Sequence, residues 1–309
     1  MPMDLTFAGY QSEASVHTRA GRVFAERLAA LCSGEASLAL MPDITQQGRA
    51  STDLFAMLAA NEIGFCYYAS SAQAGSVPLL GILDLPFAIH DRAKAFAALD
   101  GEVGARLSAE VAARTPFRLL GFWDNGFRHF SNARRPLRRP EDCRGLRMRT
   151  LNSQIYQDVL AAVGFTPVVT DAKDLPRVVA SGEVDGQENP LTNLLHFGLN
   201  AYHPYVTVSA HIFGVALFLC NRTAYENWPA DLRHAVDDAA RAATLAQRRF
   251  AAEDDVTCRA ELEKGGTRFV DLTPEERAAF RAAAAPVVQP RIDALDRELA
   301  LRYLASQDG

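Results

Sequence analysis

The chain has 309 residues, of which 49% are hydrophobic and 22% are charged, with a formal net charge of −5 and a pI near 5.8. This composition is typical of a globular protein and excludes a disordered or fibrous chain. The acidic balance provides no basic face for phosphates, so nucleic acid is not an expected partner. The length allows two domains of ordinary size.

Targeting and redox features are few. No window contains the roughly 18 uninterrupted apolar residues that a membrane span requires. The first residues, MPMDLTFAGY, lack a basic region followed by an apolar one, so no secretion signal is predicted in the sequence as given. The cysteines form no CxxC pair and are odd in number, which argues against a disulfide framework or a zinc site; they are Cys32, Cys66, Cys143, Cys220 and Cys258.

The first part of the chain alternates strands and helices. Strands are predicted at 5–8, 36–40 and 65–68, and the intervening helices at 16–31, with a stop at Gly34, and around 54–58. The order strand, helix, strand, helix, strand is typical of a parallel, doubly wound sheet.

A second unit of the same kind follows. Strands are predicted at 146–150, 165–170 and 183–185, and the helices between them at 155–163 and 175–179, the latter capped by Asp171 or Asp174. The segments VPLLGILDLPFAI and FRLLGFW between the two units are expected to supply buried strands. From Trp228 onward a helical pattern continues for about ten turns, far beyond the ~11-residue average helix. This helix is long enough to brace both units, and it is also expected to pack by one amphipathic face; the two interpretations do not conflict.

Catalytic signatures are missing from the sequence. There is no GxGxxG, GxxxxGK[ST], GxSxG or HExxH, and the seven histidines lack metal-ligand spacing. We therefore predict no catalytic residue, no cofactor and no metal site.

The strand at 146–150 carries arginines suited to an anion. In LRMRT, Arg147 and Arg149 point to one face, and Arg149 lies nearer the carboxyl end, where open α/β sheets bind ligands. A guanidinium matches a carboxylate with two parallel hydrogen bonds. Arg128 in DNGFRHFSN is a second candidate. For either arginine the alternative is a surface ion pair.

The stretch VDGQENP predicts a helix start at the end of a strand. Asn189 has the chemistry of an N-cap and Pro190 that of a first helical position. The Asn189 side chain is expected either to cap this helix or to donate to a ligand oxygen.

Together, GLRMRT, GFTPV, VDGQENPLTN, WDNGFRHFSN and DLPFAI resemble the DctP-type solute-binding proteins of tripartite ATP-independent periplasmic (TRAP) transporters, and the resemblance covers nearly the whole chain. It implies an α/β fold of two lobes, each an open β-sheet flanked by helices, with a long helix spanning both lobes. The expected boundaries are 1–125 plus 212–250 for lobe I, and 126–211 plus 251–309 for lobe II. Ligand would bind in the cleft between the lobes, which then close.

The resemblance also implies roles for individual residues. Arg149 corresponds to the family's main clamp on a substrate carboxylate, Arg128 to a second arginine, and Asn189 to an asparagine that contacts the same group. In the first lobe, residues that follow two strands are expected to face the cleft: Gln11, Ser12, Glu13 and Ser15 after the first strand, and Tyr68, Ser70 and Ser71 after the third. Trp123 and Phe213 are expected either to wall the cleft or to belong to the core.

The expected function is that of a periplasmic receptor without catalytic activity. It would bind a small organic acid, either a hydroxylated sugar-derived acid or an aromatic acid, and deliver it to integral membrane TRAP permease subunits. The protein is expected to be a monomer whose signal peptide has been removed. Two alternatives are a soluble sensor that signals after binding the same ligand, and an enzyme that uses Glu13 with a nearby histidine as acid and base.

Overall fold

The computed structural model describes residues 3–32 and 36–307, so the predicted helix stop at Gly34 lies outside the described residues. Strands occupy β1 (Met3–Ala8), β2 (Ala36–Met41), β3 (Phe65–Ala69), β4 (Phe117–Asn132), β5 (Arg147–Thr150), β6 (Thr166–Val169), β7 (Gly186–Asn189), β8 (Tyr205–Asn221) and β9 (Arg268–Asp271). Helices occupy α1 (Val16–Cys32), α2 (Asp53–Ala59), α3 (Arg92–Leu99), α4 (Glu102–Arg114), α5 (Gln154–Ala162), α6 (Leu175–Ala180), α7 (Leu191–His196), α8 (Arg222–Asn227), α9 (Ala230–Lys264), α10 (Pro274–Ala294) and α11 (Arg297–Ala305).

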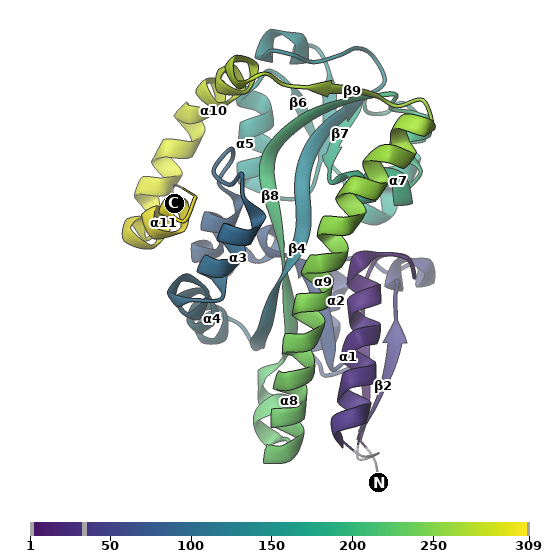
Figure 1. The fold of residues 1–309 in the computed structure, drawn as a ribbon, viewed down its shortest axis with the longest axis vertical. Helices are drawn as coiled ribbons and strands as arrows, with labels where there is room; N and C mark the ends of the chain where they lie inside the picture. The colour runs from purple at the N-terminus through teal and green to yellow at the C-terminus, as the bar shows by residue number, and fades with distance from the viewer. Residues whose placement is uncertain (1–2, 33–35, 308–309) are drawn as a thin grey trace.

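The strands form one sheet in the order β2-β1-β3-β8-β4-β7-β5-β6, with β9 paired to β8. The strands at each end, β1 to β3 and β5 to β7, pair in parallel among themselves, as the alternating pattern predicts. The two long antiparallel strands β4 and β8 join these halves and run through the middle of the molecule (Figure 1). We call the half built around β1 to β3 the first lobe and the half built around β5 to β7 the second lobe.

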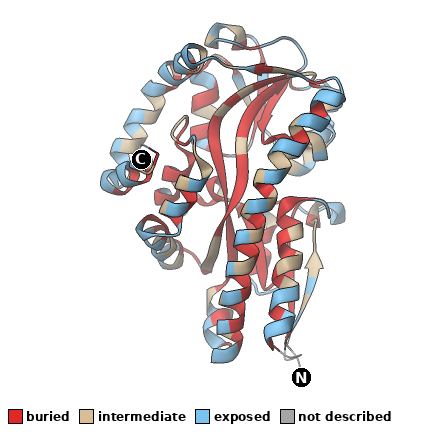
Figure 2. Ribbon diagram, viewed as in Figure 1, coloured by how far each residue is buried: buried red, intermediate tan, exposed pale blue. Residues whose placement is uncertain are grey.

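Each lobe has its own hydrophobic core. Phe7, Phe24 and Phe218 belong to a large cluster in the first lobe, whereas the second lobe contains two smaller clusters, one around Phe130 and one around Leu262. Figure 2 shows the strands buried in the centre and the outer faces of the helices exposed. The predicted two-lobed α/β fold is therefore confirmed.

Helix α9 contacts both lobes. Its first half contributes Val236 and Ala239 to the first-lobe core, and its second half contributes Cys258 and Leu262 to a second-lobe core. It packs along α1 and β4, and Arg19 of α1 donates to Asp254 at 2.8 Å. The helix thus braces both lobes through its amphipathic face, which joins the two readings of the sequence.

Two local predictions are wrong. The segment expected as a buried strand forms the 3-10 helix η3 (Pro78–Asp84), because its apolar run carries no strand period and Pro78 begins the turn. The short strand expected at 183–185 begins at Gly186 instead.

The predicted lobe boundaries place the C-terminal helix α11 in lobe II. In the structure Leu299, Ala300 and Tyr303 of α11 pack in the first-lobe core. An amphipathic pattern predicts a buried face but does not indicate which core receives it. We therefore place α11 with the first lobe and retain the other boundaries as a prediction.

Candidate functional site

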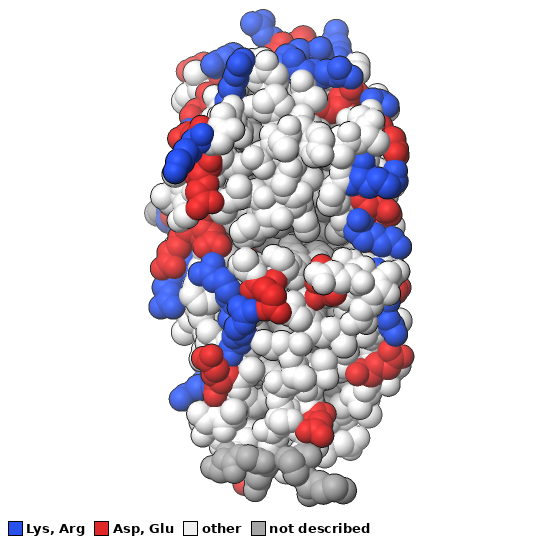
Figure 3. Space-filling view, turned by 90° about the vertical axis from the view of Figure 1, so that its right-hand side faces the viewer, with Lys and Arg blue, Asp and Glu red and all other residues white. Residues whose placement is uncertain are grey.

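A cavity of about 320 Å³ lies between the lobes, within the size range of small-molecule sites. It is lined by Tyr10, Thr52, Tyr68, Ala69, Ala72, Asn125, Arg128, Arg149, Leu151, Asn152, Val169, Thr170, Asp171, Ala172, Leu175, Asn189, Asn193 and Phe197. The carboxyl ends of β3, β5, β6 and β7 meet here, as expected for an open α/β sheet. Figure 3 views the molecule from the side of α1 and α9, where charged side chains gather mainly along the two edges and the middle is largely uncharged.

Arg149 of β5 is a buried cation in this cavity without a carboxylate partner. Arg149 is only 3% exposed, and its Nε and Nη2 donate to the Thr170 carbonyl oxygen at 3.1 and 2.6 Å. Within the described part of the chain, no Asp or Glu lies within 4.0 Å of this guanidinium. Burial lowers the pKa of Arg149 to about 10, although the charge of Glu188 raises it. The site therefore contains positive charge that an anion can compensate.

Arg128 of β4, by contrast, is already paired. Its Nε donates to Glu188 Oε2, and its Nη2 donates to Glu188 Oε1 at 3.0 Å and to Asn189 Oδ1 at 3.2 Å. Thr150 Oγ1 donates to Glu188 Oε1 at 2.8 Å, and His211 Nε2 lies 3.5 Å from Oε2. Burial raises the pKa of Glu188, but the charge of Arg128 and the hydrogen bonds from His211 and Arg128 together outweigh it and lower the pKa to about 2. Glu188 thus fixes Arg128 at the edge of the cavity.

Asn189 lines the cavity but does not cap a helix, which corrects the predicted helix start. It is the last residue of β7, and Pro190 occupies the N-cap of α7. The Asn189 amide accepts from Arg128 and from Asn193 Nδ2 at 3.1 Å, and donates to Gln187 Oε1. Asn189 pairs with His129 of β4, so Asn189 stays in the sheet and the helix begins one residue later than predicted.

Two first-lobe residues from the prediction reach toward the second lobe. Tyr68 lines the cavity, and its hydroxyl lies 2.6 Å from Ser51 Oγ, which donates to Asp171 Oδ2 at 2.9 Å. Gln11 lies behind the lining, where its Nε2 donates to Asn193 Oδ1 at 3.2 Å. These hydrogen bonds join the two lobes on either side of the cavity, so the cleft between the lobes is closed in this structure.

The other predicted polar residues lie elsewhere. Ser15 caps α1, accepting from the Thr18 amide at 3.1 Å. Ser12 and Glu13 are exposed, and Glu13 pairs with Arg22. Ser70 and Ser71 are buried next to the lining residues Ala69 and Ala72, and their hydroxyl oxygens have no hydrogen-bond partner in the described part of the chain.

The aromatic candidates belong to the core rather than the cavity wall. Trp123 is fully buried, packs against the tilted ring of Phe218 and donates from Nε1 to Thr244 Oγ1 at 3.0 Å. Phe213 packs against Phe96 and Phe127. Neither residue lines the interlobe cavity.

Several lining residues were not predicted as ligand contacts, chiefly Asp171, Asn125, Asn152 and Asn193. Asp171 and Asn152 each follow a predicted strand, which is the signal that could have found them. Asn125 and Asn193 reach the cavity only through a register shift in β4 and the placement of α7, respectively. No local pattern encodes those positions.

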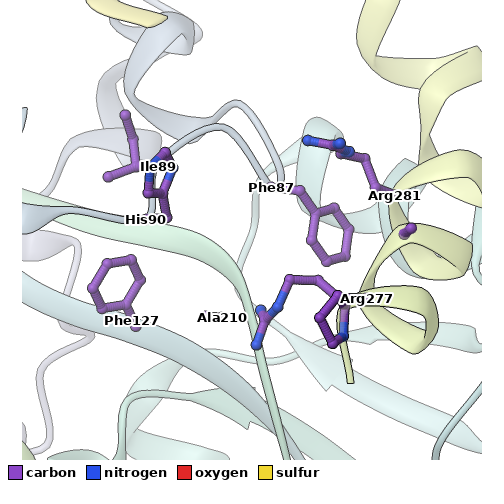
Figure 4. Close-up of a pocket in the computed structure, with 9 residues that line it drawn as sticks. Phe87, Ile89, His90, Phe127, Ala210, Arg277 and Arg281 are labelled. Atoms are coloured by element: carbon purple, nitrogen blue, oxygen red, sulfur yellow. The ribbon is translucent and has the colours of Figure 1, made fainter. Parts of the chain in front are cut away.

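A second cavity of about 440 Å³ lies between α10 and the middle of the long strands. Figure 4 shows Phe87, Arg277 and Arg281 toward one end of it and Ile89, His90 and Phe127 toward the other. Arg277 already donates to the carbonyl oxygens of Ser209 and Val208 at 2.5 and 3.3 Å, and Arg281 is exposed. Because this cavity holds no buried, uncompensated charge, the interlobe cavity is the stronger candidate for a carboxylate.

Near the cleft, Asp84 is a buried carboxyl group that forms no ion pair within 4.0 Å among the residues that the structure describes. Tyr156 of the second lobe donates to its Oδ1 at 3.1 Å, while its Oδ2 has no hydrogen-bond partner. Burial raises the pKa of Asp84 to about 7, against the lowering effects of the Tyr156 hydrogen bond and the Arg128 charge.

Replacing Asp84 with asparagine should therefore stabilise the protein increasingly between pH 4 and pH 7. A folded-state pKa above the unfolded value of 3.8 means that stability present at low pH is lost as the pH rises through about 7, and asparagine escapes that loss. Melting temperatures of variant and wild type at pH 5 and pH 8 test this. A gain that is equal at both pH values would contradict it.

No three His, Cys, Asp or Glu side chains within 3–32 and 36–307 are grouped so as to hold a metal ion. Over the same residues, no helix has both the length and the apolar character needed to cross a membrane.

The fold and the interlobe cavity define a two-lobed solute-binding protein. Residues 7–293 match the family described as bacterial extracellular solute-binding protein, family 7, and the chain belongs to this family. It is 36% identical to a solute-binding protein of Verminephrobacter eiseniae over 68% of this chain and 62% of that protein, and 32% identical to the C4-dicarboxylate-binding periplasmic protein DctP of Rhodobacter capsulatus over 67% of this chain and 62% of that protein. The matched stretch thus spans less than two thirds of either relative.

Solved structures match nearly the whole chain. A TRAP periplasmic solute-binding protein from Sulfurospirillum deleyianum with bound succinate has a TM-score of 0.92 and 27% identity, covering 99% of this chain and 100% of that one. The sugar-acid-binding protein of Advenella mimigardefordensis in complex with galactonate has a TM-score of 0.94 at 23% identity, covering 99% and 98%, which supports the fold.

Proposed function

We propose that this protein is an extracytoplasmic receptor that binds a small organic acid between its lobes and delivers it to the membrane subunits of a TRAP transporter. One observation carries the proposal: Arg149 places a buried guanidinium without a carboxylate partner on the wall of an interlobe cavity. A ligand carboxylate would supply the missing negative charge. It would also accept hydrogen bonds from the Arg149 N–H groups that do not donate to Thr170.

The comparisons support this assignment. One relative is named for binding C4-dicarboxylates, and a solved neighbour at 27% identity holds succinate. Both ligands are small acids, and a cavity of about 320 Å³ suits a ligand of that kind. Membership of the family supports delivery to a permease and a periplasmic location, and we propose that the receptor acts as a monomer without cofactor or catalytic step.

In this proposal Arg149 binds the carboxylate, while Arg128 and Asn189 orient it from the neighbouring strands. Tyr68 contributes from the first lobe, and Gln11 acts through Asn193. Contacts from both lobes stabilise the closed state over the open one, because they form only when the cleft is shut.

A thermal-shift screen of small mono- and dicarboxylic acids tests the function. A ligand at a hundred times its Kd stabilises the folded state by about 2.7 kcal/mol, so at least one acid should raise the melting temperature by several degrees. Neutral sugars of similar size serve as controls. A melting temperature that is unchanged by every acid would refute the proposal.

A further inference from the structure

Asp171 places a carboxylate on the same wall of the cavity as Arg149. The two are adjacent through the backbone, because Thr170, which accepts both Arg149 hydrogen bonds, directly precedes Asp171. Both side chains line the cavity. The charge of Asp171 is also among those that raise the pKa of Arg149, against the larger lowering effect of burial.

The Asp171 carboxylate is held in place by neutral donors. Its Oδ1 accepts from the Lys173 amide at 3.0 Å, and its Oδ2 accepts from Ser51 Oγ at 2.9 Å. Since the Ser51 hydroxyl has a single proton, Tyr68 must donate to Ser51 at 2.6 Å, so the three residues form one directed chain across the cleft.

The hydrogen bonds from Ser51 and Lys173 leave Asp171 with unused acceptor capacity. A carboxylate can accept about four hydrogen bonds, and two are made. Among the residues that the structure describes, none of the ion pairs within 4.0 Å involves Asp171. A ligand donor near the Arg149-bound carboxylate can therefore reach an oriented, negatively charged acceptor.

We propose that Asp171 makes the cleft selective for monocarboxylic acids that carry a hydroxyl group close to the carboxylate, and selects against dicarboxylic acids. A hydroxyl would donate to Asp171 while the ligand carboxylate binds Arg149. A second carboxylate beside Asp171 would be repelled by the like charge. An ammonium group in place of the hydroxyl would be attracted by Asp171 but would also lie close to the Arg149 guanidinium, and a neutral hydroxyl avoids that repulsion. This inference rests on the proposed function and specifies its ligand class.

Calorimetric titration of the full chain with D-glycerate, D-gluconate, butyrate, succinate and L-serine tests it. We expect one of the two hydroxy acids to bind at least tenfold more tightly than each of butyrate, succinate and L-serine. Asp171→Asn should weaken hydroxy-acid binding about tenfold and strengthen succinate binding, because it retains the acceptor for Ser51 but removes the charge.

Asp174→Asn is the matched control. It makes the same charge change in the same loop, but Asp174 does not line the cavity and only approaches the exposed Arg177 at 4.0 Å. The control should leave the preference for hydroxy acids within threefold of wild type. Ligand-free melting curves verify that both variants are folded.

The outcomes separate the two proposals. If the wild type binds succinate, butyrate or L-serine more tightly than the hydroxy acids, or if Asp171→Asn leaves the ratio of hydroxy-acid to succinate affinity within threefold, the selectivity assigned to Asp171 is overturned while the receptor function stands. If the wild type binds none of these acids and none in the wider screen, the proposed function fails and the inference fails with it.

Discussion

Replacing Arg149 with methionine should weaken the binding of carboxylic acids by about 30-fold to several thousand-fold. Removing one partner of a buried, hydrogen-bonded charge pair typically costs about 2–5 kcal/mol of binding free energy, and methionine keeps most of the apolar stem. The ligand-free protein should lose little stability, because the two lost hydrogen bonds to Thr170 are offset by relief from burying an uncompensated charge. Calorimetric titration with the tightest acid of the screen measures the loss.

Arg147→Met is the matched control for this experiment. Arg147 lies two residues earlier on β5 and points to the same face, but it is exposed and pairs with Asp185 at 2.9 Å. The Arg147→Met variant should bind the acid with the affinity of the wild type. Binding by Arg149→Met within threefold of the wild type would remove the clamp assigned to Arg149.

Replacing Glu188 with glutamine should lower the free energy of unfolding by about 3–5 kcal/mol. The substitution leaves Arg128 buried at 2% exposure without its carboxylate, and breaking a buried ion pair from one side has this magnitude. Urea-induced unfolding at pH 7 measures the change. The double variant Arg128→Met/Glu188→Leu should recover much of the loss, because no buried charge remains uncompensated.

The acid sensitivity of the wild type provides a second measure of the same pair. The folded-state pKa of Glu188, about 2, lies below its ordinary value of 4.5, so its contribution is present above pH 4.5 and is lost as the pH falls through about 2. The unfolding free energy of Glu188→Gln should therefore decline less steeply than that of the wild type over this range. A loss below 1 kcal/mol at pH 7 would show that the pair is not an important contributor to stability.

Much of the fold can be predicted because its signals are local. Apolar periodicity located the strands ending at Ala8, Tyr68 and Thr150 and the long helix from Trp228 to within a few residues. The segment before Leu85 was mistaken for a strand, since a short apolar run has the same composition in a buried 3-10 turn.

Part of the candidate site can also be predicted from local signals. Arg149 can be proposed as a ligand residue because it lies near the carboxyl end of a strand, where open α/β sheets bind ligands. Arg128 could be proposed as a ligand residue, but its pairing with Glu188 and Asn189 depends on the antiparallel register of β4 and β7. Arg128 and Glu188 are 60 positions apart, so no local sequence pattern predicts that they meet.

The sequence by itself determined that this chain forms two α/β units with a cationic strand end, because strand and helix periods and side-chain charge are properties of neighbouring residues. Only the tertiary structure decided that Arg149 has no carboxylate partner among the described residues, that Arg128 has one, and that Asp171 lines the cavity with a hydrogen bond from Ser51. Pairing and burial arise when distant segments pack together, and the free energy of a charge depends on that packing rather than on its neighbours along the chain.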